Sequence, residues 1–187
     1  LMNLQPRYSL AHVLSGVRTL EEIVIDAPGG IRFVPGANGV PEWANLSDFE
    51  RQNLIHQFRK LDSNTDIMVF DCGAGISRGV LSFALAADQV LVVTTPQPPA
   101  LTDAYATIKT LYREKYAGQV GVVVNMAHTK SEAAATFRRL TDVAQKFLNY
   151  PVANRGYILQ DNSVELAVRE RCPFAIRYPR SNASACM

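Results

Sequence analysis

Three short segments of the chain consist almost entirely of aliphatic residues, without the polar alternation of a half-exposed strand. They are DIMVFD (66–71), QVLVVTT (89–95) and QVGVVVN (119–125). Strands that helices cover on both faces have this composition, whereas strands with one face in water alternate. We therefore predict that these segments are parallel strands of one sheet.

Segments with helical periodicity separate the predicted strands. Between 47 and 61, Leu54, Ile55, Phe58 and Leu61 fall on one face of a helix. The pattern also predicts helices over 9–16, 77–87, 102–112, 131–148 and 162–169, and short strands within 29–39 and near Tyr157. This alternation predicts an α/β fold, a doubly wound and mostly parallel sheet with helices on both faces. No repeat or long linker divides the sequence, so we expect a single domain over 1–187.

Composition narrows the classes of protein that fit this fold. The chain has 187 residues, 48% of them hydrophobic, and a net charge of only +2, so nothing in it demands nucleic acid as a partner. The half from residue 101 onward is mildly basic, with 12 Lys and Arg against 7 Asp and Glu. Three cysteines without a CxxC spacing indicate a reducing compartment and argue against a zinc site. The longest apolar stretch (79–96) is interrupted by Asp88, so no membrane-spanning segment is predicted.

Polar residues and glycines stand at the carboxyl ends of the predicted strands. In a doubly wound sheet, ligands bind at this edge. Asp71 ends the strand 66–71 and is followed by Gly73 and Gly75. Asn125 ends the strand 119–125, and Asp161 follows the strand near Tyr157. An acid there can hold Mg²⁺ through water, a glycine can offer its N–H to a phosphate, and an asparagine can pair with an adenine edge. The set predicts a nucleotide site with one component missing.

Each of these residues also has a purely structural interpretation. Asp71 with its glycines could form a tight strand-to-helix turn, with Asp71 capping the helix. Asn125 could simply end a strand in a turn. Asp161 is equally suited to capping the helix predicted at 162–169.

The segments DIMVFDCGAGIS, ADQVLVVTTPQPPALTDAYATIK, VVVNMA and LQPRYSLAHVLSGVRTLEEIVIDAPGGIRFVPGANG carry a resemblance over nearly the whole chain. They resemble the MinD/ParA group of deviant-Walker P-loop ATPases, and within it the FlhG (FleN) regulators of flagellar number and placement. By this resemblance Asp71 corresponds to the aspartate that holds Mg²⁺ through water, and Gly75, beside Gly73, to the glycine that faces the γ-phosphate. Asn125 and Asp161 correspond to adenine-side positions.

The resemblance also implies cofactors and partners. These are ATP and Mg²⁺, a nucleotide-dependent homodimer, flagellar assembly or regulatory proteins, and the inner face of the cell membrane, reached from the cytoplasm by a C-terminal helix. Direct binding of nucleic acid is not expected.

The sequence departs from the family pattern at both ends. The family begins with a strand and a KGGVGKT-type loop, but no G-x-x-x-x-G-K-[ST] occurs here, and the amphipathic membrane helix at the C-terminus is absent too. Without the lysine loop, tight ATP binding loses its main electrostatic contributions. We therefore interpret the chain as a partial MinD/FlhG-like nucleotide-binding domain, inactive as an ATPase by itself. The alternatives are a septum-site or DNA-segregation ATPase of the same family, or a non-catalytic truncated paralogue that serves as an interaction module.

Overall fold

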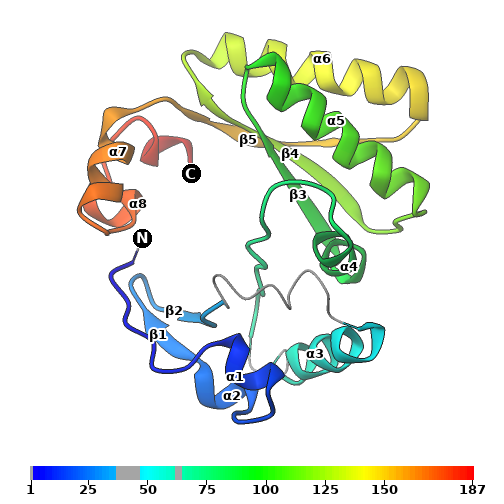
Figure 1. Cartoon of the computed structure of the whole chain (residues 1–187). Coiled ribbons are helices and arrows are strands. Elements are labelled where there is room, and N and C mark those ends of the chain that lie inside the picture. The colour runs from blue at the N-terminus through cyan, green and yellow to red at the C-terminus, as the bar shows by residue number, and fades with distance from the viewer. Residues whose placement is uncertain (1, 37–46, 62–64) are drawn as a thin grey trace. The chain divides into compact units, whose positions relative to one another are not determined.

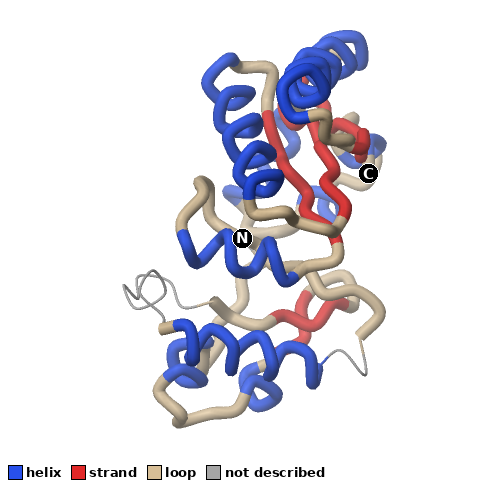
Figure 2. The backbone as a smooth tube through the Cα atoms, turned by 90° about the vertical axis from the view of Figure 1, so that its right-hand side faces the viewer, coloured by secondary structure: helices blue, strands red, loops and turns tan. Residues whose placement is uncertain are grey.

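The computed structural model describes residues 2–36, 47–61 and 65–187. The chain forms two compact units, residues 1–83 and 84–187 (Figure 1). Their strands belong to two separate sheets, drawn in red in Figure 2. No helix in the described ranges is long and apolar enough to span a membrane.

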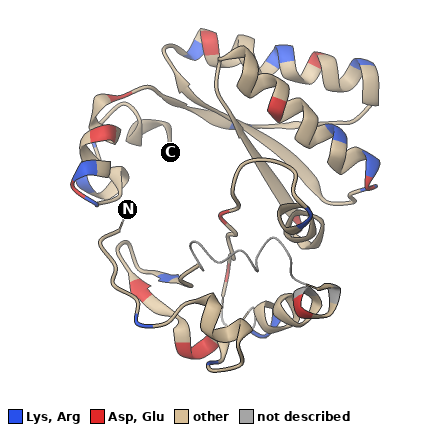
Figure 3. Cartoon of the chain, in the orientation of Figure 1, with Lys and Arg blue, Asp and Glu red and all other residues tan. Residues whose placement is uncertain are grey.

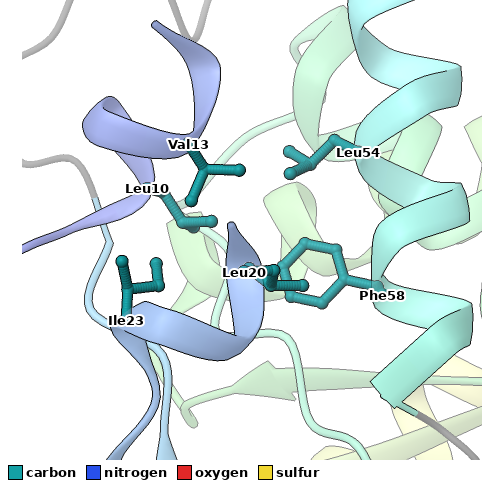
Figure 4. Packing of buried hydrophobic residues seen from close by; sticks show 6 residues of the cluster. All are labelled: Leu10, Val13, Leu20, Ile23, Leu54 and Phe58. Atoms are coloured by element: carbon teal, nitrogen blue, oxygen red, sulfur yellow. The ribbon is translucent and has the colours of Figure 1, made fainter. Parts of the chain in front are cut away.

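The first unit is built on short helices and a small hairpin. Its core is a cluster of buried aliphatic and aromatic side chains from three helices: Leu10, Val13, Leu20, Ile23, Leu54 and Phe58 (Figure 4). Thr19 and Glu22 form a capping box at the start of the second of these helices, since the Glu22 carboxylate accepts the Thr19 N–H at 2.7 Å and the Thr19 hydroxyl accepts the Glu22 N–H at 3.4 Å. The elements are α1 (Leu10–Leu14), α2 (Leu20–Ile23), β1 (Ile25–Ala27), β2 (Ile31–Phe33), α3 (Asp48–Leu61) and the first part of α4 (Arg78–Ala86).

The second unit contains a parallel sheet of three strands in the order β3-β4-β5. Its strands are β3 (Gln89–Thr94), β4 (Gln119–Ala127) and β5 (Ala153–Leu159). Helices α5 (Pro98–Arg113) and α6 (Lys130–Leu148) pack on one face of the sheet (Figure 1). That face carries the most buried strand residues, among them Val92, Thr94, Val122 and Val124. The chain ends with α7 (Asn162–Arg169), α8 (Phe174–Arg177) and the short 3₁₀-helix η3 (Ser184–Cys186).

The strand predicted over 66–71 is wrong for the described structure, because these residues join no ladder. Their side chains nevertheless alternate, as in a strand, between those that contact the first unit and those that are exposed. Phe70 stacks on Phe83 with ring centroids 5.4 Å apart, and Met68 packs against the core of the first unit. Ile67 and Val69 are 80% and 83% exposed. The aliphatic composition is that of a strand, but a strand also needs a neighbour to accept its backbone hydrogen bonds.

Two other differences concern local structure. The hairpin of β1 and β2 pairs Ile25 with Phe33, so the predicted strand within 29–39 has a partner that the sequence pattern did not indicate. Helix α5 begins at Pro98, four residues before its predicted start. Two prolines occupy its first turn, where a missing N–H costs no hydrogen bond. The helices predicted over 47–61, 77–87, 131–148 and 162–169 are confirmed as α3, α4, α6 and α7.

Candidate functional site

The candidate residues fall in both units, so each group is described within its own unit. Asp71, Gly73 and Gly75 belong to the first unit, whereas Asn125 and Asp161 belong to the second. All three residues of the first group are exposed. Gly75 has φ +99°, a backbone conformation that side chains rarely adopt. The space around an added Cβ is open at Gly73 and Gly75, so their backbone is accessible to a ligand.

The structure weakens one alternative role for Asp71. Ser77 lies directly before α4, and its hydroxyl accepts the Val80 N–H at 3.4 Å while its carbonyl accepts the Leu81 N–H at 2.9 Å. Ser77 therefore has the hydrogen bonds of an N-cap residue, and Asp71 stands six residues before it. The carboxylate of Asp71 is left exposed at the start of the glycine turn.

No group of three or more His, Cys, Asp or Glu side chains in the described ranges is placed to hold a metal ion. Such a cluster is not what Mg²⁺ requires in nucleotide enzymes, where one or two carboxylates, water and the substrate phosphates complete its shell. Asp71 fits that pattern as a lone exposed carboxylate. Its neighbour Cys72 is exposed, but partial desolvation of the thiol, helped by the charge of Asp71, raises the pKa of Cys72 and makes it a weaker nucleophile at neutral pH.

The second unit brings its candidate residues to one edge of the sheet. The strands are parallel, so the carboxyl ends of β3, β4 and β5 share that edge. Asn125 lies near the end of β4, within a stretch where the pairing with β5 shifts register. Its Oδ1 accepts the N–H of Met126 at 2.9 Å, and Met126 has φ +57°. The side chain of Asn125 thus stabilises an irregular strand end.

Asp161 lies two residues after the end of β5 and is the N-cap residue of α7. Its Oδ1 accepts the Ser163 N–H at 2.8 Å, and its Oδ2 accepts the Ala183 N–H at 3.2 Å. These N–H groups, that of Ser163 first, lower the pKa of the Asp161 carboxyl. Ala183 is fully buried, so Asp161 fastens the C-terminal segment to the end of the sheet. The helix cap could be predicted from the local sequence, but the bond to a residue 22 positions away had no local signal.

Comparisons with known proteins agree with the sequence pattern. No family model matches the chain. The antiactivator FleN of Pseudomonas aeruginosa is 38% identical over 184 residues, which are 98% of this chain and 66% of FleN. The flagellum site-determining protein YlxH of Helicobacter pylori is 32% identical over 164 residues, which are 87% of this chain and 55% of YlxH. The chain thus spans somewhat less than two thirds of the length of these relatives.

Solved structures share the fold at low sequence identity. A ParA family ATPase from Chlorobium tepidum has a TM-score of 0.75 at 19% identity, over 100% of this chain and 75% of that protein. The septum site-determining protein MinD of Pyrococcus horikoshii, complexed with Mg-ADP, has a TM-score of 0.70 at 18% identity, over 98% of this chain and 71% of that protein. The fold is therefore that of the MinD and ParA structures. Together with the identity to FleN and YlxH, it establishes that the chain belongs to the MinD/ParA-type family of deviant-Walker P-loop ATPases.

Proposed function

We propose that this chain is the greater part of a nucleotide-dependent switch that regulates the number and placement of flagella. ATP with Mg²⁺ favours a homodimer in this proposal, the dimer engages flagellar proteins, and slow hydrolysis resets the switch. The flagellar assignment is supported by the 38% identity to an antiactivator and the 32% identity to a flagellum site-determining protein. The nucleotide assignment is supported by the Mg-ADP complex of a protein with the same fold.

The observation that carries the proposal is the exposed turn after Asp71. The backbone at Gly75 is open and has a positive φ, and Ser77 has the hydrogen bonds of an N-cap residue, so Asp71 is not needed as a cap for α4. In this proposal the Gly73 and Gly75 amides bind phosphate oxygens, and Asp71 holds Mg²⁺ through water. Asn125 and Asp161 serve the adenine side. Attack of water on the γ-phosphate also needs a positively charged side chain that stabilises the transition state, such as the lysine of the family's KGGVGKT-type loop.

The decisive experiment compares variants of the product of the complete coding sequence. Asp71→Asn keeps the size and capping ability of the side chain but removes its charge. If Asp71 anchors Mg²⁺, ATP hydrolysis falls at least about 100-fold, roughly 3 kcal/mol of transition-state stabilisation. Gly75→Val places a side chain beside the phosphate and strains the backbone at φ +99°, so ATP-dependent dimerisation fails together with hydrolysis. Wild-type hydrolysis and dimerisation in Asp71→Asn would refute the magnesium role.

A genetic test separates the flagellar assignment from other roles in the family. Deletion of the gene in its own bacterium should change the number or position of flagella, counted by electron microscopy. Normal flagella together with minicells or misplaced septa would overturn the assignment in favour of a septum-site protein. Normal flagella with loss of plasmid or chromosome partitioning would favour a segregation ATPase.

A further inference from the structure

The C-terminal segment (178–186) is held to the carboxyl edge of the sheet by the same carboxylate that begins α7. Asp161 Oδ1 accepts the Ser163 N–H at 2.8 Å, from the first turn of α7, and its Oδ2 accepts the Ala183 N–H at 3.2 Å. Ala183 is 0% exposed, so the segment cannot leave the edge without exposing a buried methyl group. The orientation of the Asp161 carboxylate thus depends on α7 on one side and on the C-terminal segment on the other.

Two serines, Ser181 and Ser184, lie on either side of Ala183 and fix the shape of the turn that they form with it. The Ser181 hydroxyl accepts the Ser184 N–H at 3.2 Å and donates to the Ser184 hydroxyl at 2.9 Å. The Ser184 hydroxyl donates to the Tyr178 carbonyl at 2.8 Å, and that carbonyl also accepts the Ser181 N–H at 3.0 Å. Both lone pairs of the Tyr178 carbonyl are therefore used to hold this turn.

Tyr178 is itself anchored by an ion pair. Charged residues of both signs lie along α7 and the residues that follow it (Figure 3). The Glu170 carboxylate accepts the Tyr178 hydroxyl at 3.0 Å with one oxygen and the Arg177 Nε–H at 2.6 Å with the other. A series of hydrogen bonds therefore leads from this pair, through Tyr178 and Ser184, toward the Asp161 carboxylate.

We propose that Ser184 is a positioning residue for the nucleotide base, because it fixes the turn that holds Asp161 and so limits the rotation of the carboxylate that accepts the exocyclic amine of adenine. This inference rests on the function proposed above, in which Asp161 serves the adenine side. At neutral pH the carboxylate is ionised and only accepts hydrogen bonds, and it has acceptor positions beyond the two that Ser163 and Ala183 use. It therefore favours adenine over hypoxanthine, which has a carbonyl oxygen in place of the amine.

Removal of the Ser184 hydroxyl should weaken binding of the base through the carboxylate. Ser184→Ala deletes the group that joins Ser181 to the Tyr178 carbonyl, so the turn loses two of its hydrogen bonds. The Asp161 carboxylate then loses a fixed partner for its Oδ2, and the rotation that is freed must be lost again when the base binds. Binding of the phosphates does not involve this carboxylate and should not change.

The test measures the Kd of Mg-ADP and of Mg-IDP by isothermal titration calorimetry, with the product of the complete coding sequence. The two nucleotides differ only at the edge of the base that carries the amine of adenine, so the ratio of their Kd values reports recognition of that amine. We expect the parent to bind Mg-ADP at least about tenfold more tightly than Mg-IDP. Ser184→Ala should raise the Kd of Mg-ADP about five- to tenfold and leave that of Mg-IDP nearly unchanged. Ser184→Thr keeps the hydroxyl and should restore the ratio of the parent.

Two further variants show whether Ser184 acts through Asp161. Ser15→Ala is the matched control, because the Ser15 hydroxyl also donates to a backbone carbonyl, that of His12 at 3.2 Å, but in the first unit. It should leave both Kd values as in the parent. Asp161→Asn removes one acceptor oxygen and should itself weaken Mg-ADP. Adding Ser184→Ala to Asp161→Asn should weaken Mg-ADP no further, because the hydroxyl then has no carboxylate to position.

The outcomes separate this inference from the proposed function. Additive losses in the double variant, or an equal loss for both nucleotides in Ser184→Ala, would overturn the positioning role. A parent that prefers Mg-ADP while Ser184→Ala keeps that preference, or a parent that binds both nucleotides equally well, would overturn this inference alone. A parent that binds neither nucleotide would overturn the proposed function and this inference with it.

Discussion

Gly118 lies at a point of close approach in the second unit, and its replacement by alanine tests how the start of β4 is packed. A Cβ at this position would overlap the hydroxyl and ring of Tyr116 and come within 2.5 Å of the Asp88 carbonyl oxygen. Tyr116 is 7% exposed, and its hydroxyl donates a hydrogen bond of 2.9 Å to the Ala87 carbonyl. The Tyr116 ring must therefore move to make room for the Cβ, which breaks its hydrogen bond to Ala87. The Asp88 carbonyl belongs to the backbone and can shift only if the chain around it shifts too.

The magnitude follows from three contributions. Overpacking in a well-packed region costs about 1–3 kcal/mol. The lost hydrogen bond of Tyr116 adds about 1 kcal/mol. The lower entropy of alanine in the unfolded chain offsets about 0.4–1 kcal/mol. We expect Gly118→Ala to reduce the free energy of unfolding by about 2 kcal/mol, which lowers Tm by roughly 4–8 °C in a chain of this size.

Urea and thermal denaturation followed by circular dichroism measure both quantities. Tyr116→Phe is the matched control, because it removes the hydroxyl but leaves the ring, and it should cost only about 1 kcal/mol. Gly36→Ala adds the same methyl group where no atom of the described residues lies within 4 Å, so it should be neutral or slightly stabilising. A Gly118→Ala protein as stable as its parent would show that the Tyr116 ring is not confined as the structure indicates, and the packing argument would fail.

Three further predictions concern the core, the C-terminal segment and the chemistry. Leu54 is 1% exposed, and Leu54→Ala should lower the free energy of unfolding in urea by about 3 kcal/mol. Phe49 lies on the same helix but is 80% exposed, so Phe49→Ala should change that free energy by less than about 0.5 kcal/mol. Equal losses in the two variants would contradict the observed core. The lowered pKa of Asp161 means that its bonds are fully formed above its unfolded pKa of about 3.9 and are lost as pH falls through the folded value. Hydrogen exchange of the Ala183 amide should therefore speed up in acid by more than the change in its intrinsic rate. In Asp161→Asn this exchange should be fast already at neutral pH. Strong protection of the Ala183 amide in that variant would argue against the hydrogen bond to the Asp161 carboxylate. The 187-residue chain should not hydrolyse Mg-ATP above background in a phosphate-release assay, and measurable turnover would reveal a phosphate site that the sequence analysis missed.

Sequence patterns predicted elements whose stability is decided locally and failed where distant residues decide. Helices α3 and α6 are long and place apolar residues at helical spacing, so their existence and extent were predictable. Segment 66–71 has the composition of a buried strand, but strand formation depends on a neighbouring strand, which composition cannot supply. Strand β1 was missed for the opposite reason, because only three residues with a central Asp26 pair there and the hairpin partner decides the conformation.

For the candidate site, too, the positions of the residues could be predicted from the sequence, but the partners of their side chains could not. Strand order and parallel direction bring Asn125 and Asp161 to the same edge of the second unit, as the sequence predicted. The partners of their side chains were not predictable, because Ala183 reaches Asp161 only through the folded C-terminal segment.

These partners still leave both side chains able to bind a base. A carbonyl oxygen has two lone pairs, and Oδ1 of Asn125 uses one for Met126 N–H, so the other can accept an exocyclic amine while the amide NH₂ donates to a ring nitrogen. A carboxylate has about four acceptor positions, and Asp161 uses two for Ser163 and Ala183. A base could therefore bind at this edge without breaking the bonds that hold the strand ends. The same bonds would limit the rotation of both side chains, so less side-chain entropy would be lost on binding than for free surface residues.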